Sequence, residues 1–554
     1  MPRIKTTAIA AGLSIAMAAG ILAACGGSNG HPATVSLSAQ DALATKTPIK
    51  HVVVIFGENI SYDHYFGTYP NASNPEGEPV FTALTGTPAA NNYTANASLL
   101  TANPNYTNTA NGTGASNPFR LDRSQAYTAS MNHNYGPEQQ AFDNLAMDLF
   151  PKYTGRAGAI GSATYATTGL VMGYFDGNTV TGLWNYAQHF AMNDNSFNTQ
   201  FGPSTPGALN LISGQTNGAT AALSSSTTPA AAAVTSGYTV ADGQAGYTVI
   251  GDPDPTGDAC SSTTNATVSM SGKNIGDVLN ASNITWGWFE GGFDRTKTNP
   301  NGTTGCQRSS YSSVVGGYKS DYVPHHEPFQ YYASTANPTH ARPTSTAMIG
   351  YTDAANHQYD TDDFFTAVAA GNFPSVSFLK APAIQDAHAG NSDPLDEQVF
   401  VTTVINFLQK QTDWSSTAVI LAYDDSDGWY DHAYQIVNPS FSTLDSLNGT
   451  STCGSGSPLN GVNGSPVNGR CGYGPRLPLL VVSPYAKSNY IDHTLTDQTS
   501  VLRFIEDNWL SGQRIGQGSF DAKAGTIENM FDFSNNGATQ KLFLDTGTGL
   551  QVSS

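Results

Sequence analysis

Charged side chains are scarce in this chain. Asp, Glu, Lys and Arg make up 12% of its 554 residues, and 23 Lys and Arg stand against 42 Asp and Glu, which gives a net charge of −19. A surface that binds nucleic acid needs a concentration of Lys and Arg that this composition does not offer. We therefore expect no nucleic-acid partner, and no segment points to a protein partner. The hydrophobic fraction of 39% is enough to build a large core.

Cysteine is also rare. The chain has five cysteines, and none of them stands in the CxxC spacing of a zinc site. Four of them follow the N-terminal segment, and an even number favours disulfides in an oxidising compartment. Pairing Cys260 with Cys306 and Cys453 with Cys471 closes the shortest loops, each within a stretch rich in Gly, Asn and Thr. We predict these two disulfides in preference to a zinc site.

The N-terminal hydrophobic run is too short to span a bilayer well. Ile9–Ala24 is rich in Ala, Leu, Ile and Met and follows the basic residues Arg3 and Lys5. It ends in Leu22-Ala23-Ala24-Cys25-Gly26, which resembles the lipobox of bacterial lipoproteins. In such a lipobox the cysteine is lipidated and becomes the new N-terminus.

The lipobox resemblance divides the chain into three parts. It implies a signal peptide over residues 1–24, a lipidated Cys25 with a polar tether over residues 25–48, and a single domain over residues 49–554. An ordinary secretory leader is the alternative, because Ala-Ala-Cys is close to an Ala-x-Ala cleavage site. Both predict an exported protein of the bacterial cell envelope. In the first case an N-terminal lipid attaches it to a membrane, and in the second it is released.

Two apolar, β-branched segments are each followed by side chains that bind metals. His51–Phe56 leads through a glycine into Glu58-Asn59, and Ala418–Tyr423 leads directly into Asp424-Asp425. Such runs predict strands covered on both faces, and in parallel sheets ligands bind beyond the carboxyl ends of the strands. Three carboxylates and an amide gathered there need a cation or strong pairing, because like charges repel. The sequence therefore predicts a metal site, and its oxygen ligands suit Ca²⁺, Mg²⁺ or Mn²⁺.

Strand and helix patterns alternate through the rest of the chain. This alternation predicts an α/β sandwich with a mostly parallel central sheet. Two polar stretches, Phe81–Asn117 and Thr216–Gly246, read as loop insertions into one domain. Further strands are expected at Ile284–Phe289, Val376–Leu379 and Leu477–Ser483, and helices at Gln140–Leu149, Val180–Phe190, Asp360–Ala370, Glu397–Lys410 and Thr499–Trp509.

A candidate nucleophile lies in a rigid turn. Ser204 stands in Gly202-Pro203-Ser204-Thr205-Pro206-Gly207, just before the apolar stretch Ala208–Ile212. A serine at the start of a helix lies where the helix dipole favours an anion such as phosphate. The spacing is not that of the G-x-S-x-G elbow, and a plain N-cap serine is the alternative. Loop histidines that could bind a phosphoryl oxygen, protonate a leaving group or ligate a metal are His133, His325, His326 and His388.

These motifs together resemble a known family. The segment Ile49–Gly67, which contains His51–Phe56 and Glu58-Asn59, is similar to the opening motif of the bacterial phosphoesterase family. That family contains phospholipases C and certain acid phosphatases, and it is related in fold to alkaline phosphatases and sulfatases. The resemblance continues through Gly202-Pro203-Ser204, Tyr423–His432, Gly474–Pro478, Ser483-Pro484-Tyr485, Ser500–Glu506 and Phe520-Asp521-Ala522.

The resemblance implies a catalytic site with named roles. One divalent ion would be held by Glu58, Asn59, Ser204, Asp424 and Asp425, and relatives of this fold use zinc or iron as well as the cations above. Ser204 would be the nucleophile, with a phosphoserine intermediate. The residues implied to bind the phosphate are Asn59, His133, His325, His326 and His388, of which His326 or His388 would protonate the leaving group.

The implied substrate depends on the branch of the family. Phospholipases C more often have Thr-Trp-Pro-Asn where this chain has Ser204-Thr205-Pro206-Gly207, and Asp-Glu where it has Asp424-Asp425. Both differences resemble the acid phosphatase branch, so hydrolysis of phosphomonoesters is the first expectation. Phospholipase C activity on phosphatidylcholine-type lipids is the alternative, and a non-catalytic surface-binding lipoprotein is the alternative of another class.

Two Asp-His pairs accompany the predicted site. Asp63-His64 follows Glu58-Asn59, and Asp431-His432 follows Asp424-Asp425. We expect both pairs to support the loops around the metal rather than to take part in catalysis.

Overall fold

The computed structural model describes residues 38, 40–157, 167–223, 237–435, 438–535 and 539–553. The signal peptide, Cys25 and most of the tether predicted from the sequence lie outside these residues, so those predictions stay predictions. Within the described ranges, no helix combines the length and the apolar character needed to cross a membrane.

An eight-stranded sheet forms the centre of the domain, in the order β14-β11-β15-β1-β16-β17-β4-β18. The first five strands are parallel, β17 is antiparallel to both of its neighbours, and β4 and β18 pair in parallel. The predicted mostly parallel sheet is therefore confirmed. The strands are β14 (Gln358–Asp360), β11 (Trp286–Glu290), β15 (Val376–Lys380), β1 (His51–Gly57), β16 (Thr417–Tyr423), β17 (Leu479–Val482), β4 (Ala191–Asn193) and β18 (Tyr490–Asp492).

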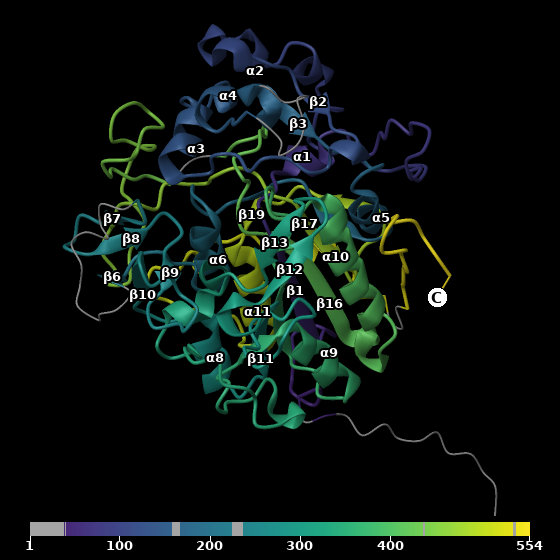
Figure 1. Ribbon diagram of the computed structural model, residues 1–554, viewed down its shortest axis with the longest axis vertical. Helices are drawn as coiled ribbons and strands as arrows, with labels where there is room; N and C mark the ends of the chain where they lie inside the picture. Colours follow the sequence, from purple (N-terminus) through teal and green to yellow (C-terminus); the bar gives the residue numbers. More distant parts are fainter. Residues whose placement is uncertain are drawn as a thin grey trace, which may run out of the picture.

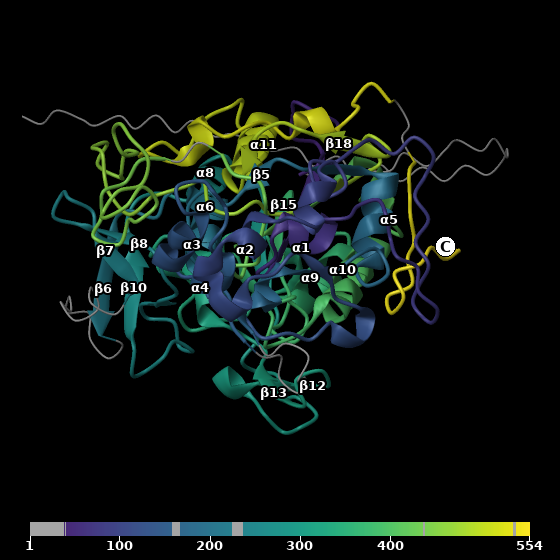
Figure 2. The ribbon, with the colours of Figure 1, turned by 90° about the horizontal axis from the view of Figure 1, so that it is seen from above.

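Helices cover both faces of this sheet, which makes the predicted sandwich (Figures 1 and 2). One layer contains α5 (Thr181–His189), α9 (Thr361–Ala369) and α10 (Pro394–Leu408), and the other contains α6 (Ser204–Ser213), α8 (Ile275–Ala281) and α11 (Thr499–Trp509). Because both faces are covered, Val52, Val53 and Val54 of β1 are all fully buried.

A cap of short elements lies above the carboxyl ends of the parallel strands (top of Figure 1). It contains α1 (Tyr62–Phe66), α2 (Pro104–Thr107), α3 (Tyr135–Phe142), α4 (Phe150–Tyr153), β2 (Phe119–Arg120) and β3 (Gly173–Tyr174). Smaller pairings at the periphery join β6 (Ala219–Leu223), β10 (Ala266–Met270) and β9 (Asp254–Pro255), β7 (Thr239–Ala241) and β8 (Tyr247–Val249), β12 (Ser309–Ser312) and β13 (Gly317–Ser320), and β5 (Ser196–Phe197) and β19 (Thr496–Asp497).

Three expectations about the insertions and the cap need correction. The helix predicted at Gln140–Leu149 is wrong, because α3 ends at Phe142 and Asp143 has a φ of 41°, in the left-handed region. Phe81–Asn117 is not only a surface loop. Its Asn92 is fully buried, and the Asn92 amide donates to the Phe66 carbonyl at 2.8 Å and ties the insertion to α1. The second insertion contains strands β6 and β7.

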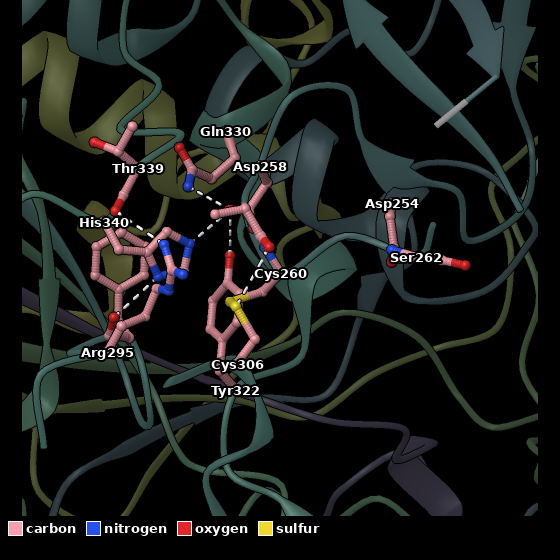
Figure 3. The surroundings of a disulfide bond; sticks show 12 residues. Asp254, Asp258, Cys260, Ser262, Arg295, Cys306, Tyr322, Gln330, Thr339 and His340 are labelled. Atoms are coloured by element: carbon pink, nitrogen blue, oxygen red, sulfur yellow. Dashed lines mark hydrogen bonds and ion pairs between the residues drawn. A yellow bond between two sulfur atoms is a disulfide. The ribbon is translucent and has the colours of Figure 1, made fainter. Parts of the chain in front are cut away.

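Both predicted disulfides are present, Cys260–Cys306 and Cys453–Cys471. Figure 3 shows the first beside a buried polar cluster around Asp258. The Asp258 carboxylate accepts from Tyr322 Oη at 3.0 Å and lies 2.9 Å from His340 Nε2. Because the cysteine sulfur is bonded in the disulfide and these donors satisfy Asp258, this cluster is structural.

Candidate active site

The register of β1 and β16 brings the two predicted pairs together. Gly57 pairs with Tyr423, so the residues that follow each strand emerge side by side at the carboxyl edge of the sheet. Glu58, Asn59, Asp424 and Asp425 are all fully buried. The Asn59 residue has a φ of 62°, and its backbone N–H donates to Asp424 Oδ1 at 2.9 Å. The first turn after β1 is thus fixed against the first turn after β16.

Ser204 joins this cluster from the start of α6. Its Oγ lies 3.0 Å from Glu58 Oε2 and 3.1 Å from Asp425 Oδ2. Pro203 is the N-cap residue and Ser204 is the first residue of the helix, so Ser204 is not the N-cap serine of the alternative interpretation. The helix packs so closely that a Cβ at Gly207 would lie 2.0 Å from the Asp424 carbonyl oxygen. Glycine at this position therefore lets the serine reach the carboxylates.

The side chains around Ser204 fit a divalent cation. One end of the Asn59 amide lies 2.9 Å from Glu58 Oε2, 3.0 Å from Asp425 Oδ2 and 3.4 Å from Ser204 Oγ. Neighbouring oxygens in an octahedral shell at about 2.1 Å from Mg²⁺ are about 3.0 Å apart, which matches this cluster. The donor set of carboxylate, amide and hydroxyl oxygens suits a hard cation.

The orientation of the Asn59 amide depends on such a cation. The hydrogen bonds alone favour the amide nitrogen facing Glu58 and Asp425, with the amide oxygen accepting from His388 Nε2 at 2.9 Å. A cation between the two carboxylates would favour the reverse orientation, because it attracts the amide oxygen.

Burial makes the cluster costly without positive charge. Burial raises the pKa of Asp424 to about 7, and the neighbouring Glu58 carboxylate adds to this rise. Burial also raises the pKa of Asp425 well above its ordinary value, with Asp424 and Glu58 adding to it. A cation would therefore best satisfy the oxygens that face one another here, those of Glu58, Asn59, Ser204 and Asp425.

Lys380, which the sequence did not single out, contacts this cluster. It is the last residue of β15, on the other side of β1 from β16. Its ammonium forms an ion pair with Glu58 and lies 3.5 Å from Asp424 Oδ2. Burial alone would lower the pKa of Lys380, but the carboxylates of Glu58 and Asp424 raise it above its ordinary value. A charge at the end of a strand carried no motif that could have marked it.

Two of the predicted histidines contact the cluster. His326 Nδ1 lies 3.3 Å from Glu58 Oε1, and burial lowers the pKa of His326 well below its ordinary value. His388 approaches the Asn59 amide through Nε2, and its Nδ1 lies 2.6 Å from the Ala389 carbonyl oxygen. The Ala389 carbonyl accepts from Nδ1–H of His388, so Nε2 faces the site. Nε2 can donate to the Asn59 amide oxygen, or to a leaving group, only when both ring nitrogens carry a proton.

The other two histidines are each paired with a carboxylate. His133 Nδ1 lies 3.0 Å from Asp427 Oδ1, and His325 Nδ1 lies 3.5 Å from Asp254 Oδ1. Burial alone would lower the pKa of both histidines, but nearby carboxylates raise it, in His133 well above its ordinary value. Both rings are therefore positioned to carry positive charge. His133, His388 and Asp427 also lie close enough to share an ion, although His133 and Asp427 already pair with each other.

Glu138 joins the cap to both halves of the site, and no sequence motif marks this residue. Its Oε2 accepts from the backbone N–H of Gly202 at 2.9 Å, two residues before the serine. Its Oε1 accepts from Ser426 Oγ at 2.8 Å, one residue after Asp424-Asp425. Burial raises the pKa of Glu138 to about 7.

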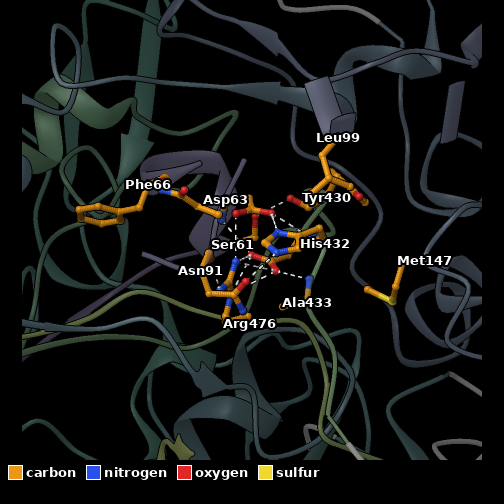
Figure 4. A network of polar contacts seen from close by, with 12 residues as sticks. Ser61, Asp63, Phe66, Asn91, Leu99, Met147, Tyr430, His432, Ala433 and Arg476 are labelled. Carbon is orange, nitrogen blue, oxygen red and sulfur yellow. Dashed lines mark hydrogen bonds and ion pairs between the residues drawn. The ribbon is translucent and has the colours of Figure 1, made fainter. Parts of the chain in front are cut away.

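A second buried network ties the same two loops together (Figure 4). Arg476 donates to Asp63 Oδ1 at 3.0 Å and to Asp431 Oδ1 at 3.1 Å. The Asp63 backbone N–H donates to Asp431 Oδ2 at 2.9 Å, and His432 Nδ1 lies 2.5 Å from Asp63 Oδ2. His64 takes no part in it and instead stacks on Trp429 at 3.9 Å between ring centroids. These contacts give Asp63 and Asp431 the supporting place expected of them.

A model of the phosphoesterase family matches residues 49–510 of the chain. The relatives found among characterised proteins carry the name phospholipase C. The non-hemolytic phospholipase C of Pseudomonas aeruginosa is 30% identical over 172 residues, which is 30% of this chain and 25% of that protein. The corresponding protein of Burkholderia pseudomallei is 35% identical over 140 residues, 25% of this chain and 19% of that protein. Phospholipase C A of Mycobacterium tuberculosis is 29% identical over 148 residues, 26% of each chain.

These sequence matches span about a quarter of the curated relatives. Among solved structures, murine ectonucleotide pyrophosphatase/phosphodiesterase 5 aligns over 64% of this chain and 95% of its own, at 10% identity and a TM-score of 0.29. The family match agrees with the predicted class, a phosphoric ester hydrolase.

Proposed function

Because the chain belongs to the phosphoesterase family, we propose that it hydrolyses phosphoric esters with Ser204 as the nucleophile. The observation that carries this proposal is the placement of Ser204 Oγ at the start of α6, within 3.1 Å of both Glu58 Oε2 and Asp425 Oδ2. A binding module has no need of a hydroxyl held against two buried carboxylates.

A divalent ion is part of the proposal. Glu58, Asn59, Ser204 and Asp425 would hold it, with Asp424 beside them. When bound, such an ion makes the serine hydroxyl easier to deprotonate and offsets negative charge on the phosphoryl oxygens. The oxygen donors favour Mg²⁺, Mn²⁺ or Ca²⁺.

The protein groups supply the proton transfers. Either Glu58 Oε2 or Asp425 Oδ2 is close enough to accept the Ser204 proton as Oγ forms its bond to phosphorus. The ester P–O bond then breaks on the opposite side, and the departing oxygen takes a proton from an imidazole. Water attacks the phosphoserine, which releases phosphate and restores the serine.

The histidines would hold the phosphoryl group. His133 and His325 are suited to offset its charge, because carboxylate partners favour their protonated forms. His388 is better placed than His326 to protonate the leaving group, because burial holds the pKa of His326 well below its ordinary value. The first helical N–H groups add little, since the Thr205 N–H already donates to Asp252 Oδ1 at 2.8 Å.

The substrate proposal keeps two candidates. Acid phosphatase activity on phosphomonoesters is favoured by Ser204-Thr205-Pro206-Gly207 and Asp424-Asp425, while phospholipase C activity is favoured by the names of the relatives. Assays of the purified protein with p-nitrophenyl phosphate and with phosphatidylcholine vesicles separate them. We expect turnover of the monoester that is lost in Ser204→Ala. Turnover of the lipid alone would reverse the ranking, and turnover of neither would favour the binding lipoprotein.

We also propose export and lipid attachment through Cys25. The chain joins the domain at the amino ends of the strands, where Gln40 Oε1 accepts from the Thr285 N–H at 3.0 Å and from Ser375 Oγ at 3.3 Å. The site lies at the opposite, carboxyl ends. A lipid-attached molecule would therefore carry its site away from the attachment point, which favours soluble phosphomonoesters. Labelling with radioactive palmitate tests the lipid, and Cys25→Ser should abolish labelling and release the protein without changing its turnover.

A further inference from the structure

Among the residues that the structure describes, Lys380 is the one lysine that reaches the proposed ion site. It ends β15 next to Glu58, its exposed fraction is 1%, and its ammonium lies 4.8 Å from the centroid of the Phe56 ring. The aliphatic part of the side chain is buried, and the carboxylates hold the ammonium. Together these contacts fix the direction of the ammonium. Its position is therefore set by the fold and not by surface flexibility.

The lysine divides the oxygens of Glu58 into two sets. Glu58 Oε1 faces Lys380 and His326, while Glu58 Oε2 faces Ser204 Oγ at 3.0 Å. Asp424 is divided differently, since one of its oxygens is held by the backbone and the other faces the lysine. Asp424 Oδ1 accepts from two backbone N–H groups, and Oδ2 lies 3.5 Å from the ammonium.

For the three carboxylates Glu58, Asp424 and Asp425, the lysine supplies the positive charge that one divalent ion does not, while the nearby His133 is already paired with Asp427. Glu58, Asp424 and Asp425 carry three negative charges when ionised, and one divalent ion supplies two positive charges. The Lys380 ammonium supplies the third. Without it, a buried negative charge would stay uncompensated, which is costly in the protein interior.

From this arrangement we propose that Lys380 is a positioning residue that serves as the resident second cation of the site. It holds one oxygen of Glu58 and one of Asp424 away from the nucleophile and makes a single exchangeable divalent ion sufficient. This inference rests on the proposed ion site, and it adds the reason why one ion is enough.

The test compares Lys380→Met with Lys380→Arg and with the control Lys487→Met, which removes a partly exposed lysine that contacts Tyr490. Titration calorimetry measures Mn²⁺ affinity, and p-nitrophenyl phosphate measures kcat. Because the ammonium repels the ion, we expect Lys380→Met to bind Mn²⁺ about tenfold more tightly while kcat falls at least about tenfold. Lys380→Arg should keep the wild-type Mn²⁺ affinity, and so should the control.

Equal Mn²⁺ affinity in Lys380→Met and wild type would overturn the proposal. So would weaker binding in both Lys380 variants, since that result indicates a packing role. If Lys380→Met does not fold, the double variant Lys380→Met/Asp424→Asn tests the charge role instead, because it removes one charge of each sign. Recovery of folding and Mn²⁺ binding supports the charge role, and failure contradicts it. A wild type that binds no Mn²⁺ would instead remove the ion site, and this inference with it.

Discussion

Two buried acidic clusters lie in the same two loops of this protein, and they differ in what satisfies them. In one, Glu58 and Asp425 turn their oxygens toward another oxygen, that of Ser204. In the other, Asp63 and Asp431 turn theirs toward the guanidinium of Arg476. In the proposed function the first cluster takes part of its positive charge from a bound ion, whereas the second contains its own.

Two equally buried aspartates show this contrast in their pKa values, whereas the pKa of Glu58 in the first cluster is lowered, despite burial, beside Lys380 and burial raises that of Asp431 in the second to about 6. Burial raises the pKa of Asp424 to about 7, whereas Asp63, also fully buried, has its pKa held below the ordinary value by His432 and Arg476 despite burial. Residue type and depth therefore do not distinguish a catalytic cluster from a supporting one. The two clusters are distinguished by the hydrogen-bond donors and cations that face their oxygens. Lys380 lies between the two cases, because it neutralises part of the first cluster and leaves the rest for an ion.

Removal of the proposed nucleophile should have the largest effect on turnover. Ser204→Ala should reduce kcat by at least about 10³-fold, because within the described ranges no other hydroxyl lies against both carboxylates. The steady-state rate with p-nitrophenyl phosphate measures the effect. Ser213→Ala, at the other end of α6, is the matched control and should keep its turnover. A Ser204→Ala variant with near-normal kcat would remove Ser204 from the mechanism.

Chelation acts on only one of the two clusters. EDTA followed by dialysis should abolish turnover and lower the melting temperature, since an ion at 100 times its Kd contributes about 2.7 kcal/mol of stability. Adding Mg²⁺ or Mn²⁺ should restore both, as followed by calorimetry and kinetics. Chelation should leave the Asp63–Arg476 cluster unchanged. In Asp425→Asn, which lacks a proposed ligand, EDTA should no longer lower the melting temperature. Full activity after chelation would contradict the proposed ion.

The Asp63–Asp431–Arg476 cluster should contribute to the free energy of unfolding. Arg476→Met leaves Asp63 and Asp431 buried without their cation, so we expect a loss of about 3–5 kcal/mol in the free energy of unfolding. Urea denaturation measures this loss, and Arg156→Met, on an exposed arginine, is the control. A change below about 1 kcal/mol would show that the cluster is not held together as described.

Glu138 gives the smallest effect and a definite pH dependence. Its folded pKa of about 7 exceeds its unfolded value, so the folded protein holds the proton more tightly and stability falls as pH rises from about 4.5 to 7. Glutamine at this position does not titrate, so the stability of Glu138→Gln relative to wild type should be about 3 kcal/mol greater at pH 8 than at pH 4. Urea denaturation at the two pH values measures it. Glu76→Gln, on an exposed loop, should show no such gain, and an equal gain in both variants would disprove the assignment.

The residues proposed for catalysis could be predicted from the sequence because they lie in short, recognisable segments. Glu58-Asn59 and Asp424-Asp425 directly follow apolar runs, and parallel strands bring such positions together. The family motif then supplied Ser204 and the histidines. Apolar runs also placed β1, β11, β15, β16 and β17 but missed the short strands β14, β4 and β18, and the shortest cysteine loops gave both disulfides.

The rest depended on partners that only the tertiary structure brings close. Glu138 contacts residues 64 and 288 positions away, and Lys380 reaches Glu58 from the strand that pairs with β1. Nothing in their own sequence surroundings marks either residue. The helix expected beyond Phe142 failed for a local reason, since Asp143 and Asn144 adopt left-handed conformations that asparagine and aspartate tolerate.

The central claim is that Ser204 becomes phosphorylated during turnover. Mass spectrometry of protein quenched in acid while it hydrolyses p-nitrophenyl phosphate tests it directly. We predict one added phosphoryl group on the peptide that contains Ser204, and none in Ser204→Ala. Turnover with no phosphorylated serine, or with the phosphoryl group on another residue, would contradict the account.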